Sequence, residues 1–197
     1  MSATECTAVL SDTEKGKLVA EIKERVKQEA KHLENSIGAC LQYAHHTADV
    51  INEYGIRALI QGGTMCWPRV TPEQDDGVSS THFSYVWEPD SKTSRFALAF
   101  GALPEIHVWV GIPETNEIVD LTTGKFPEAC PVLLGEPWLG PRPPDYLWQK
   151  GCPERVVYEA NQEATLYALL MIFKRYNPSY LQDAKGMLEQ VAKTWKV

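Results

Sequence analysis

The sequence predicts an α+β fold in which a central helix packs on an antiparallel sheet, with one helix before this core and a pair of helices after it. Near both ends of the chain, apolar residues recur every three or four positions, as they do on amphipathic helices. The middle of the chain holds short segments of alternating apolar and polar residues between turn sequences, which is typical of antiparallel strands. With 197 residues and no internal repeat, residues 1–197 fit a single domain with a sizeable core.

Composition narrows the classes of partner and the cellular location. The net charge is −7, the pI is near 5.3 and no block of Lys and Arg stands out, so neither nucleic acid nor a membrane is expected as a partner. The start of the chain lacks the pattern of a secretory signal, and the most apolar stretch, residues 164–173, is about half the length of a membrane span. An odd number of cysteines, 5, without close pairs favours reduced thiols and a cytoplasmic location.

The first predicted helix begins at Ser11, because Ser11 and Glu14 have the spacing of a capping box. We expect it to end near Asn35. Its buried face is predicted from helical spacing to consist of Leu18, Val19, Ile22, Val26, Ala30 and Leu33.

The second predicted helix carries the first candidate for chemistry, Cys40. Ser36 can cap this helix, and Gly55 follows it as a typical C′ residue. Its buried stripe is predicted to be Leu41, Ala44, Ala48 and Ile51. Cys40 therefore falls in the first turn, at the edge of the buried face, where unpaired N–H groups and the helix dipole favour a thiolate.

Strands are expected over residues 56–60, 81–88, 95–100, 106–111 and 116–121. We expect the first strand to end at Gly62-Gly63, a pair that a strand end or a close backbone contact would explain, and a polar loop to follow over residues 68–77. Residues 124–153 are rich in Pro and Gly and predict a long irregular segment that wraps the domain or borders a cleft.

The last two predicted strands form an antiparallel hairpin with residues 112–115 as its loop. This register puts His107 directly opposite Asp120, on one face of the sheet, with Cβ atoms roughly 5 Å apart. A slip of one residue would put the two side chains on opposite faces. The register therefore predicts a contact between an imidazole and a carboxylate.

Two helices are predicted after the irregular segment. The first covers about Val156 to Tyr176, and the second begins with Asn177 as its cap and Pro178 at its first helical position. The expected division of the domain is a catalytic-like core at about 36–124 followed by a loop and helices over 125–197.

Cys40, His107 and Asp120 together predict nucleophilic thiol chemistry. Taken singly, each has an ordinary explanation, as a core cysteine, a sheet histidine and a turn or edge carboxylate. A cysteine nucleophile needs a base that holds the thiolate and later protonates a leaving group, and the base needs a partner that sets its orientation. A helix followed by two strands supplies these three roles in order.

Four segments resemble the transglutaminase-like superfamily of papain-like cysteine enzymes. They are Gly38-Ala-Cys40-Leu-Gln-Tyr43-Ala44, Tyr54-Gly55-Ile56-Arg57-Ala58, His107-Val-Trp-Val110 and Ile118-Val-Asp120-Leu-Thr122. The resemblance implies a papain-like core, in which a central helix packs on an antiparallel sheet. It also implies Cys40 as nucleophile, His107 as base and acid, and Asp120 as the residue that orients the histidine. Related enzymes cleave amide bonds or transfer acyl groups to amines.

Other residues are candidates for the same site. The backbone N–H of Cys40 and the side chain of Gln42 or Gln61 could stabilise an oxyanion. His82 and Trp109 could line the substrate pocket, His82 because its strand is expected beside that of His107.

Three functions stay open. The first is a cysteine hydrolase or acyltransferase that acts on a peptide-like amide or acyl substrate through a thioester, without metal or cofactor. The second is a catalytically inactive binding protein on the same scaffold. The third is a zinc-dependent hydrolase, for which the sequence offers His45, His46, Cys66 and His82 but no established ligand spacing.

Overall fold

The computed structural model describes residues 10–29, 39–75, 80–92, 94–95 and 105–195. The helices in these ranges are α1 (Asp12–Glu29), α2 (Cys40–Glu53), α4 (Phe126–Leu134), α5 (Gln162–Tyr176) and α6 (Lys185–Trp195). The strands are β1 (Leu59–Pro68), β2 (His82–Tyr85), β3 (His107–Ile112), β4 (Glu117–Asp120), β5 (Leu147–Lys150) and β6 (Val157–Ala160). Together they form an α+β fold, as predicted.

The sheet is antiparallel, with strand order β2-β1-β3-β4-β5 and with β6 on β1. β3 pairs with β1 up to Gly63, β2 pairs with β1 from Met65 onward, and β6 pairs across both positions. A strand has two edges, so β2 and β3 lie end to end along one edge of β1 while β6 occupies the other. This arrangement brings Tyr85, His107 and Tyr158 to the middle of β1.

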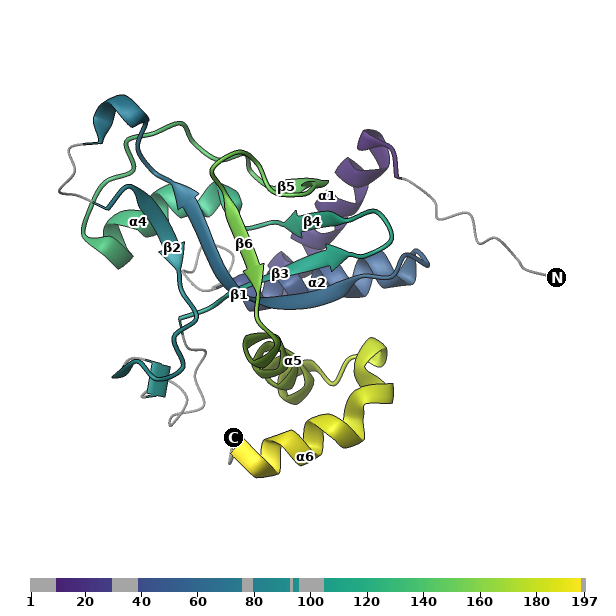
Figure 1. Cartoon of the computed structure of the whole chain (residues 1–197). Coiled ribbons are helices and arrows are strands. Elements are labelled where there is room, and N and C mark those ends of the chain that lie inside the picture. Colours follow the sequence, from purple (N-terminus) through teal and green to yellow (C-terminus); the bar gives the residue numbers. More distant parts are fainter. Residues whose placement is uncertain (1–9, 30–38, 76–79, 93, 96–104, 196–197) are drawn as a thin grey trace.

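Helices cover the two faces of the sheet unequally. Figure 1 shows α1 and α2 behind β3 and β4, α4 beside β2, and α5 with α6 below the sheet. The larger core joins α1, α2 and α5 to the sheet residues Ile60, Val108, Val110, Ile112 and Val119. A smaller core on the other face joins α4 to Met65, Trp67, Phe83, Leu147 and Val156. His107 points toward this smaller, aromatic core, because it alternates with Val108 along β3.

The predicted ends of the first two helices agree with the structure where it describes them. The backbone N–H of Ser11 donates to the Glu14 carboxylate at 2.8 Å, and the N–H of Glu14 donates to the Ser11 hydroxyl at 3.4 Å. Gly55 follows α2 in the left-handed region, at φ +75°. The predicted end of the first helix at Asn35 and the predicted cap at Ser36 lie outside the described residues.

Gly62 and Gly63 do not end the first strand. β1 starts at Leu59 and runs through both glycines, so the predicted end of the strand was wrong. A Cβ atom on Gly62 would lie 2.8 Å from a carbonyl oxygen in α5, and one on Gly63 would lie 2.1 Å from the Glu159 oxygen in β6. The predicted close backbone contact is confirmed, because the glycines allow α5 and β6 to approach β1.

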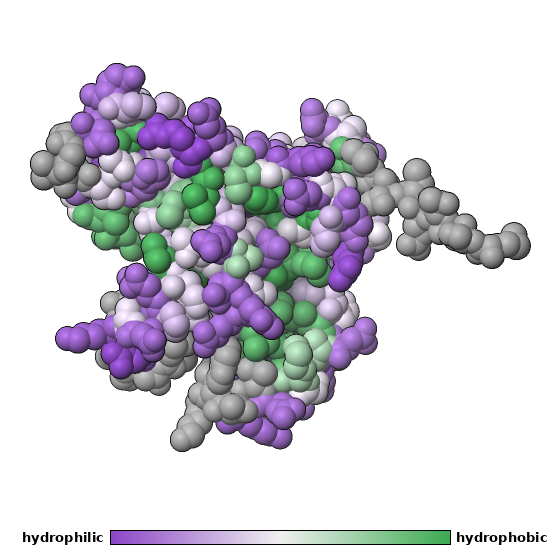
Figure 2. Space-filling model, viewed as in Figure 1, coloured by the Kyte–Doolittle hydropathy of each residue, from purple (hydrophilic) through white to green (hydrophobic). Residues whose placement is uncertain are grey.

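The segment predicted as irregular holds two regular elements, α4 and β5. Pro127 sits in the first turn of α4, where a missing N–H costs nothing, although Pro131 also lies inside the helix. The end of α4 carries the exposed apolar residues Val132, Leu133 and Leu134, and Figure 2 shows apolar surface at this place. The predicted loop at 68–77 includes a 3-10 turn at Pro72–Gln74. Of the predicted strand at 95–100, only Arg95 is described, and it is helical.

The predicted helix from Val156 to Tyr176 was wrong in its first turn. Residues Val157–Ala160 form β6, and α5 begins only after Asn161, whose side chain accepts from two backbone N–H groups at 2.9 and 3.1 Å. Asn177 was predicted as the cap of the last helix, but it ends α5 in a left-handed conformation at φ 45°. A 3-10 helix, η3 (Ser179–Ala184), then precedes α6. Within the described ranges, no helix has the length and apolarity to cross a membrane.

Candidate active site

The hairpin of β3 and β4 brings His107 and Asp120 together in a register two residues away from the prediction. Ile112 is paired with Glu117, so the loop is 113–116 rather than 112–115. The cause is local, because Asn116 takes the left-handed conformation at φ 56° and completes the turn that Pro113 begins.

His107 and Asp120 still meet because the observed register differs from the predicted one by two residues, an even number. Continuing the observed register puts Trp109, and not His107, across from Asp120. A shift of two residues keeps each side chain on its face of the sheet. His107 is therefore a diagonal neighbour of Asp120, and its Nε2 lies 2.7 Å from the Asp120 Oδ2 atom.

Four donors surround the Asp120 carboxylate. His107 Nε2 and the Tyr158 hydroxyl both donate to Oδ2 at 2.7 Å. The backbone N–H and the hydroxyl of Thr122 donate to Oδ1 at 2.8 and 2.6 Å. Burial alone would raise the pKa of Asp120, but His107 and these hydrogen bonds lower it below its usual value. Asp120 is thus a buried, ionised group whose orientation is held from both oxygens.

His107 is held in the protonated state by its neighbours. Burial alone would lower the pKa of His107, but the Asp120 carboxylate and then the Cys40 thiol raise it to about 10. Nε2 is engaged by Asp120, so Nδ1 is the ring nitrogen left to exchange a proton with Cys40. Nδ1 is buried. Cys40 contributes to the raised pKa of the His107 ring through a side-chain hydrogen bond and then through its charge.

Cys40 is the first residue of α2 and is 6 % exposed. The first hydrogen bond of the helix runs from the N–H of Tyr43 to the oxygen of Ala39 at 3.0 Å. The N–H of Cys40 precedes this bond, at the positive end of the helix dipole, which favours a negatively charged group nearby. This placement agrees with the predicted position of Cys40 in the first turn.

Aromatic rings enclose His107. Tyr85 and Trp109 stack with the imidazole at centroid distances of 5.5 and 6.1 Å, and Phe126 meets it edge-on at 5.6 Å. Tyr158 completes the enclosure at 6.0 Å. The pKa of Tyr85 is raised by burial and then by the charges of Cys40 and Asp120, which puts this hydroxyl in the same electrostatic environment. Such an enclosure excludes water and strengthens the interaction of His107 with Asp120.

The two glutamines predicted as oxyanion donors point elsewhere. Gln61 accepts a hydrogen bond from the Trp109 indole at 2.7 Å, and its amide packs over Gly111, away from His107 along β3. Gln42 is buried, and it interacts with Glu29 at the end of α1. Of the predicted donors, only the backbone N–H of Cys40 lies at the thiol.

His82 does not join His107 either. Its strand, β2, pairs with β1 and not with β3, and His82 lies across from Pro68. Alternation along β2 puts Tyr85 on the face of His107 and His82 on the opposite face. The His82 ring instead contacts the Thr81 hydroxyl at 2.8 Å. Trp109 is the pocket-lining candidate that the structure does bring to His107.

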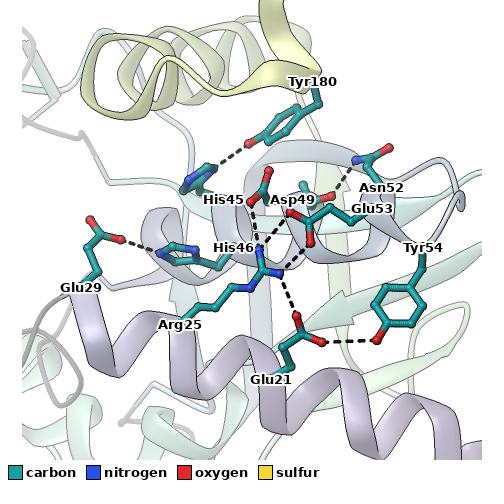
Figure 3. A network of polar contacts seen from close by, with 11 residues as sticks. Glu21, Arg25, Glu29, His45, His46, Asp49, Asn52, Glu53, Tyr54 and Tyr180 are labelled. Atoms are coloured by element: carbon teal, nitrogen blue, oxygen red, sulfur yellow. Dashed lines mark hydrogen bonds and ion pairs between the residues drawn. The ribbon is translucent and has the colours of Figure 1, made fainter.

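Two of the histidines of the zinc alternative, His45 and His46, belong to a separate polar network between α1, α2 and η3 (Figure 3). His45 is directed toward the Tyr180 hydroxyl at 2.9 Å, whereas His46 is directed toward Glu29 at 2.5 Å. Cys66 and His82 lie on β1 and β2. In the part of the chain that the structure describes, no three His, Cys, Asp or Glu side chains are grouped so that they could hold a metal ion.

Three residues of the site were missed from the sequence. Thr122 follows Asp120 by two residues, and this spacing is that of an Asx-type turn, so local reasoning could have found it. Tyr85 and Tyr158 gave no local signal. They come from β2 and β6, and only the pairing of both strands with β1 brings them to His107 and Asp120.

A pocket of about 410 Å³ opens on the same face of the sheet. It is lined by residues that include Gln61, Trp109, Gly111, Cys152 and Tyr158. Trp109 and Tyr158 also contact His107. These two rings therefore belong both to the pocket lining and to the surroundings of His107.

No protein-family model, no curated protein and no solved structure matches this chain. Function is therefore inferred from the chemistry of Cys40, His107 and Asp120.

Proposed function

We propose that the chain is a cysteine hydrolase or acyltransferase that acts on an amide or acyl carbonyl of a peptide-like substrate. The observation that supports this best is the set of contacts around His107. One side of the ring is held by Asp120 at 2.7 Å, and Cys40 at the start of α2 adds to the charge that keeps the ring protonated. A thiol, an imidazolium and an orienting carboxylate are the groups that a thioester mechanism requires.

In this mechanism the Cys40 thiolate, stabilised by the His107 imidazolium, attacks the carbonyl carbon. The carbonyl oxygen becomes an oxyanion, for which the backbone N–H of Cys40 is one donor. His107 then gives its proton to the leaving amine, the C–N bond breaks and a thioester remains. Water or an acceptor amine attacks the thioester and passes its proton to His107, and the Cys40 thiolate leaves.

The likeness to the transglutaminase-like superfamily is part of the same proposal. The packing of α2 against β1 and β3 is compatible with the papain-like core that this likeness implies. A cytoplasmic location also belongs to the proposal, because 5 cysteines without close pairs favour reduced thiols over a disulfide framework. No metal and no cofactor enter the mechanism.

The second candidate function, a binding protein without turnover, is favoured by burial. Cys40, His107 and Asp120 are 6 %, 1 % and 2 % exposed. A substrate carbonyl must reach the Cys40 sulfur, whereas a structural ion pair needs no access at all. In a binding protein, the pair of His107 and Asp120 would serve only the packing of the smaller core.

Cysteine alkylation separates these two functions. Burial predicts that Cys40 is alkylated more slowly than an exposed cysteine, whereas activation of its thiol predicts that it is alkylated faster. The side chain of Cys152 is exposed, so access alone predicts that Cys152 reacts before Cys40. At pH 6 an ordinary thiol is less than about 1 % ionised. We expect iodoacetamide at pH 6 to modify Cys40 at least about tenfold faster than Cys152, measured by mass spectrometry of the two peptides.

Two variants complete the experiment. His107→Gln should abolish the preference for Cys40, whereas His45→Gln, a buried histidine of the other network, should retain it. Faster labelling of Cys152 in the parent would refute the enzyme proposal, as would an unchanged rate at Cys40 in His107→Gln. Acetylation of Cys40 by 4-nitrophenyl acetate, with release of nitrophenolate, would then establish that the thiolate attacks a carbonyl.

A further inference from the structure

Tyr158 makes a contact with Asp120 that the thiol mechanism above does not use. Its hydroxyl donates to the Asp120 Oδ2 atom at 2.7 Å, and the same oxygen accepts from His107 Nε2 at 2.7 Å. Oδ1 is taken by the two donors of Thr122. Among the residues that the structure describes, Tyr158 is thus the neighbour that shares a single Asp120 oxygen with the histidine.

We infer that Tyr158 is a positioning residue of the proposed cysteine site, which fixes the Asp120 carboxylate from β6 and limits its hold on His107. This inference rests on the proposed function. An oxygen that accepts two hydrogen bonds divides its charge between them, so each donor is bound less strongly than it would be alone. A weaker hold on the imidazolium makes it a better acid toward a leaving group.

The fold holds the Tyr158 hydroxyl in a defined place. Tyr158 pairs with Met65 in the sheet, and the close approach of β6 to β1 depends on Gly63. The phenol ring meets Trp109 edge-on at a centroid distance of 5.2 Å, and Trp67 at 6.5 Å. Rings fixed in this way leave the hydroxyl little freedom, so its direction toward Asp120 is set by packing.

The hydroxyl stays a donor over the working pH range. Burial, and then the charge of Asp120, raise the pKa of Tyr158 well above its ordinary value, so the phenol remains protonated. The titratable groups that face His107 are Cys40, Tyr85, Asp120 and Tyr158. Among them, Tyr158 is the group that donates to the same Asp120 oxygen as His107 does.

Tyr158→Phe removes this hydrogen bond and retains the ring. The ring contacts with Trp109 and Trp67 are therefore preserved. The matched control is Tyr180→Phe, which also removes one partly buried tyrosine hydrogen bond, to His45 at 2.9 Å in the other network. Any effect common to both variants reports a general cost of losing a hydroxyl.

The measurement is the titration of the His107 ring by NMR. We expect the midpoint of deprotonation to rise by about one pH unit in Tyr158→Phe, because a hydrogen bond to a charged group is comparable in strength to one pKa unit. The midpoint should not move in Tyr180→Phe. A second measurement needs no variant: the parent should show a nuclear Overhauser effect between the Tyr158 hydroxyl proton and the proton on His107 Nε2.

The outcomes separate this inference from the proposed function. If the midpoint in Tyr158→Phe equals that of the parent, or if it shifts equally in Tyr180→Phe, the positioning role is overturned. If Tyr158→Phe does not fold, the Overhauser effect in the parent decides, and its absence overturns the inference. The proposed function fails instead if Cys40 labelling is independent of His107, whatever the two tyrosine variants show.

Discussion

Replacing Asp120 with Asn removes the charge that the site is built around. In the parent, all four hydrogen bonds of Asp120 are accepted by its carboxylate. An amide at this place keeps one accepting oxygen, which suits the two donors of Thr122. Its N–H₂ group would then face His107 Nε2, itself a donor. Asp120→Asn therefore leaves a buried histidine without the carboxylate that keeps it charged.

The cost follows from the pKa of His107. Asp120 is the main cause that raises the pKa of His107 to about 10 against the lowering effect of burial, so its loss should bring this pKa back toward the ordinary value of about 6.5. At 1.36 kcal/mol for each pKa unit, this difference corresponds to about 5 kcal/mol. Removing one partner of a buried ion pair costs about 3–5 kcal/mol in measured cases. We therefore expect Asp120→Asn to lower the free energy of unfolding at pH 6 by about 3–5 kcal/mol.

The two pKa shifts determine how the stability of the folded protein changes with pH. The folded pKa of His107 lies above its unfolded value, so its contribution to stability is complete below pH 6.5 and is lost as the pH rises toward about 10. The folded pKa of Asp120 lies below its unfolded value, so that contribution is complete above about pH 4 and is lost in acid. The parent should therefore gain most from the pair between about pH 4 and 6.5.

Urea denaturation at pH 5, 6, 8 and 9 checks both parts of this prediction. In the parent, the free energy of unfolding should fall between pH 6 and 9, and in Asp120→Asn this fall should be largely absent. Thr122→Val is a useful comparison, because it removes one donor to Asp120 and leaves the charge in place. A variant Asp120→Asn that is as stable as the parent, or that retains the parent's pH dependence, would refute the assignment of His107 and Asp120 as a buried ion pair.

Two further predictions concern other parts of the fold. Gly63→Ala should destabilise the folded protein by several kcal/mol in thermal unfolding, since its Cβ would lie 2.1 Å from the Glu159 oxygen. It should also slow Cys40 labelling, because β6 would have to move. An unchanged melting temperature would contradict this prediction. Burial and then His46 lower the pKa of His45 to about 4. Stability should thus fall as the pH drops from 6.5 to 4, and His45→Gln should weaken this fall; equal acid sensitivity of the two proteins would speak against it.

Local sequence signals were reliable where one segment decides its own structure. The capping box of Ser11 and Glu14, the glycine after α2 and the place of Cys40 in the first turn all depend on residues within a few positions of one another. Hydrogen bonds of a helix end are local, so a short pattern is enough to predict them.

Elements that depend on a distant partner were less predictable. The apolar run after Val156 gave no sign that its first residues pair with β1, because a buried strand and a buried helix can share one composition. The Pro- and Gly-rich segment likewise hides α4, whose apolar face is stabilised only by packing on the sheet. In both cases tertiary contacts outweigh local propensity.

For the candidate site, the sequence by itself determined which residues share a face. His107 and Asp120 alternate with buried neighbours on two adjacent strands, and strand periodicity is two, so their contact tolerated an error of two residues in the register. Only the tertiary structure decided what surrounds them. Tyr85 and Tyr158 arrive from the two edges of β1, and no local pattern encodes a hydrogen bond from β6 to β4, because strand pairing joins residues that are distant in the chain.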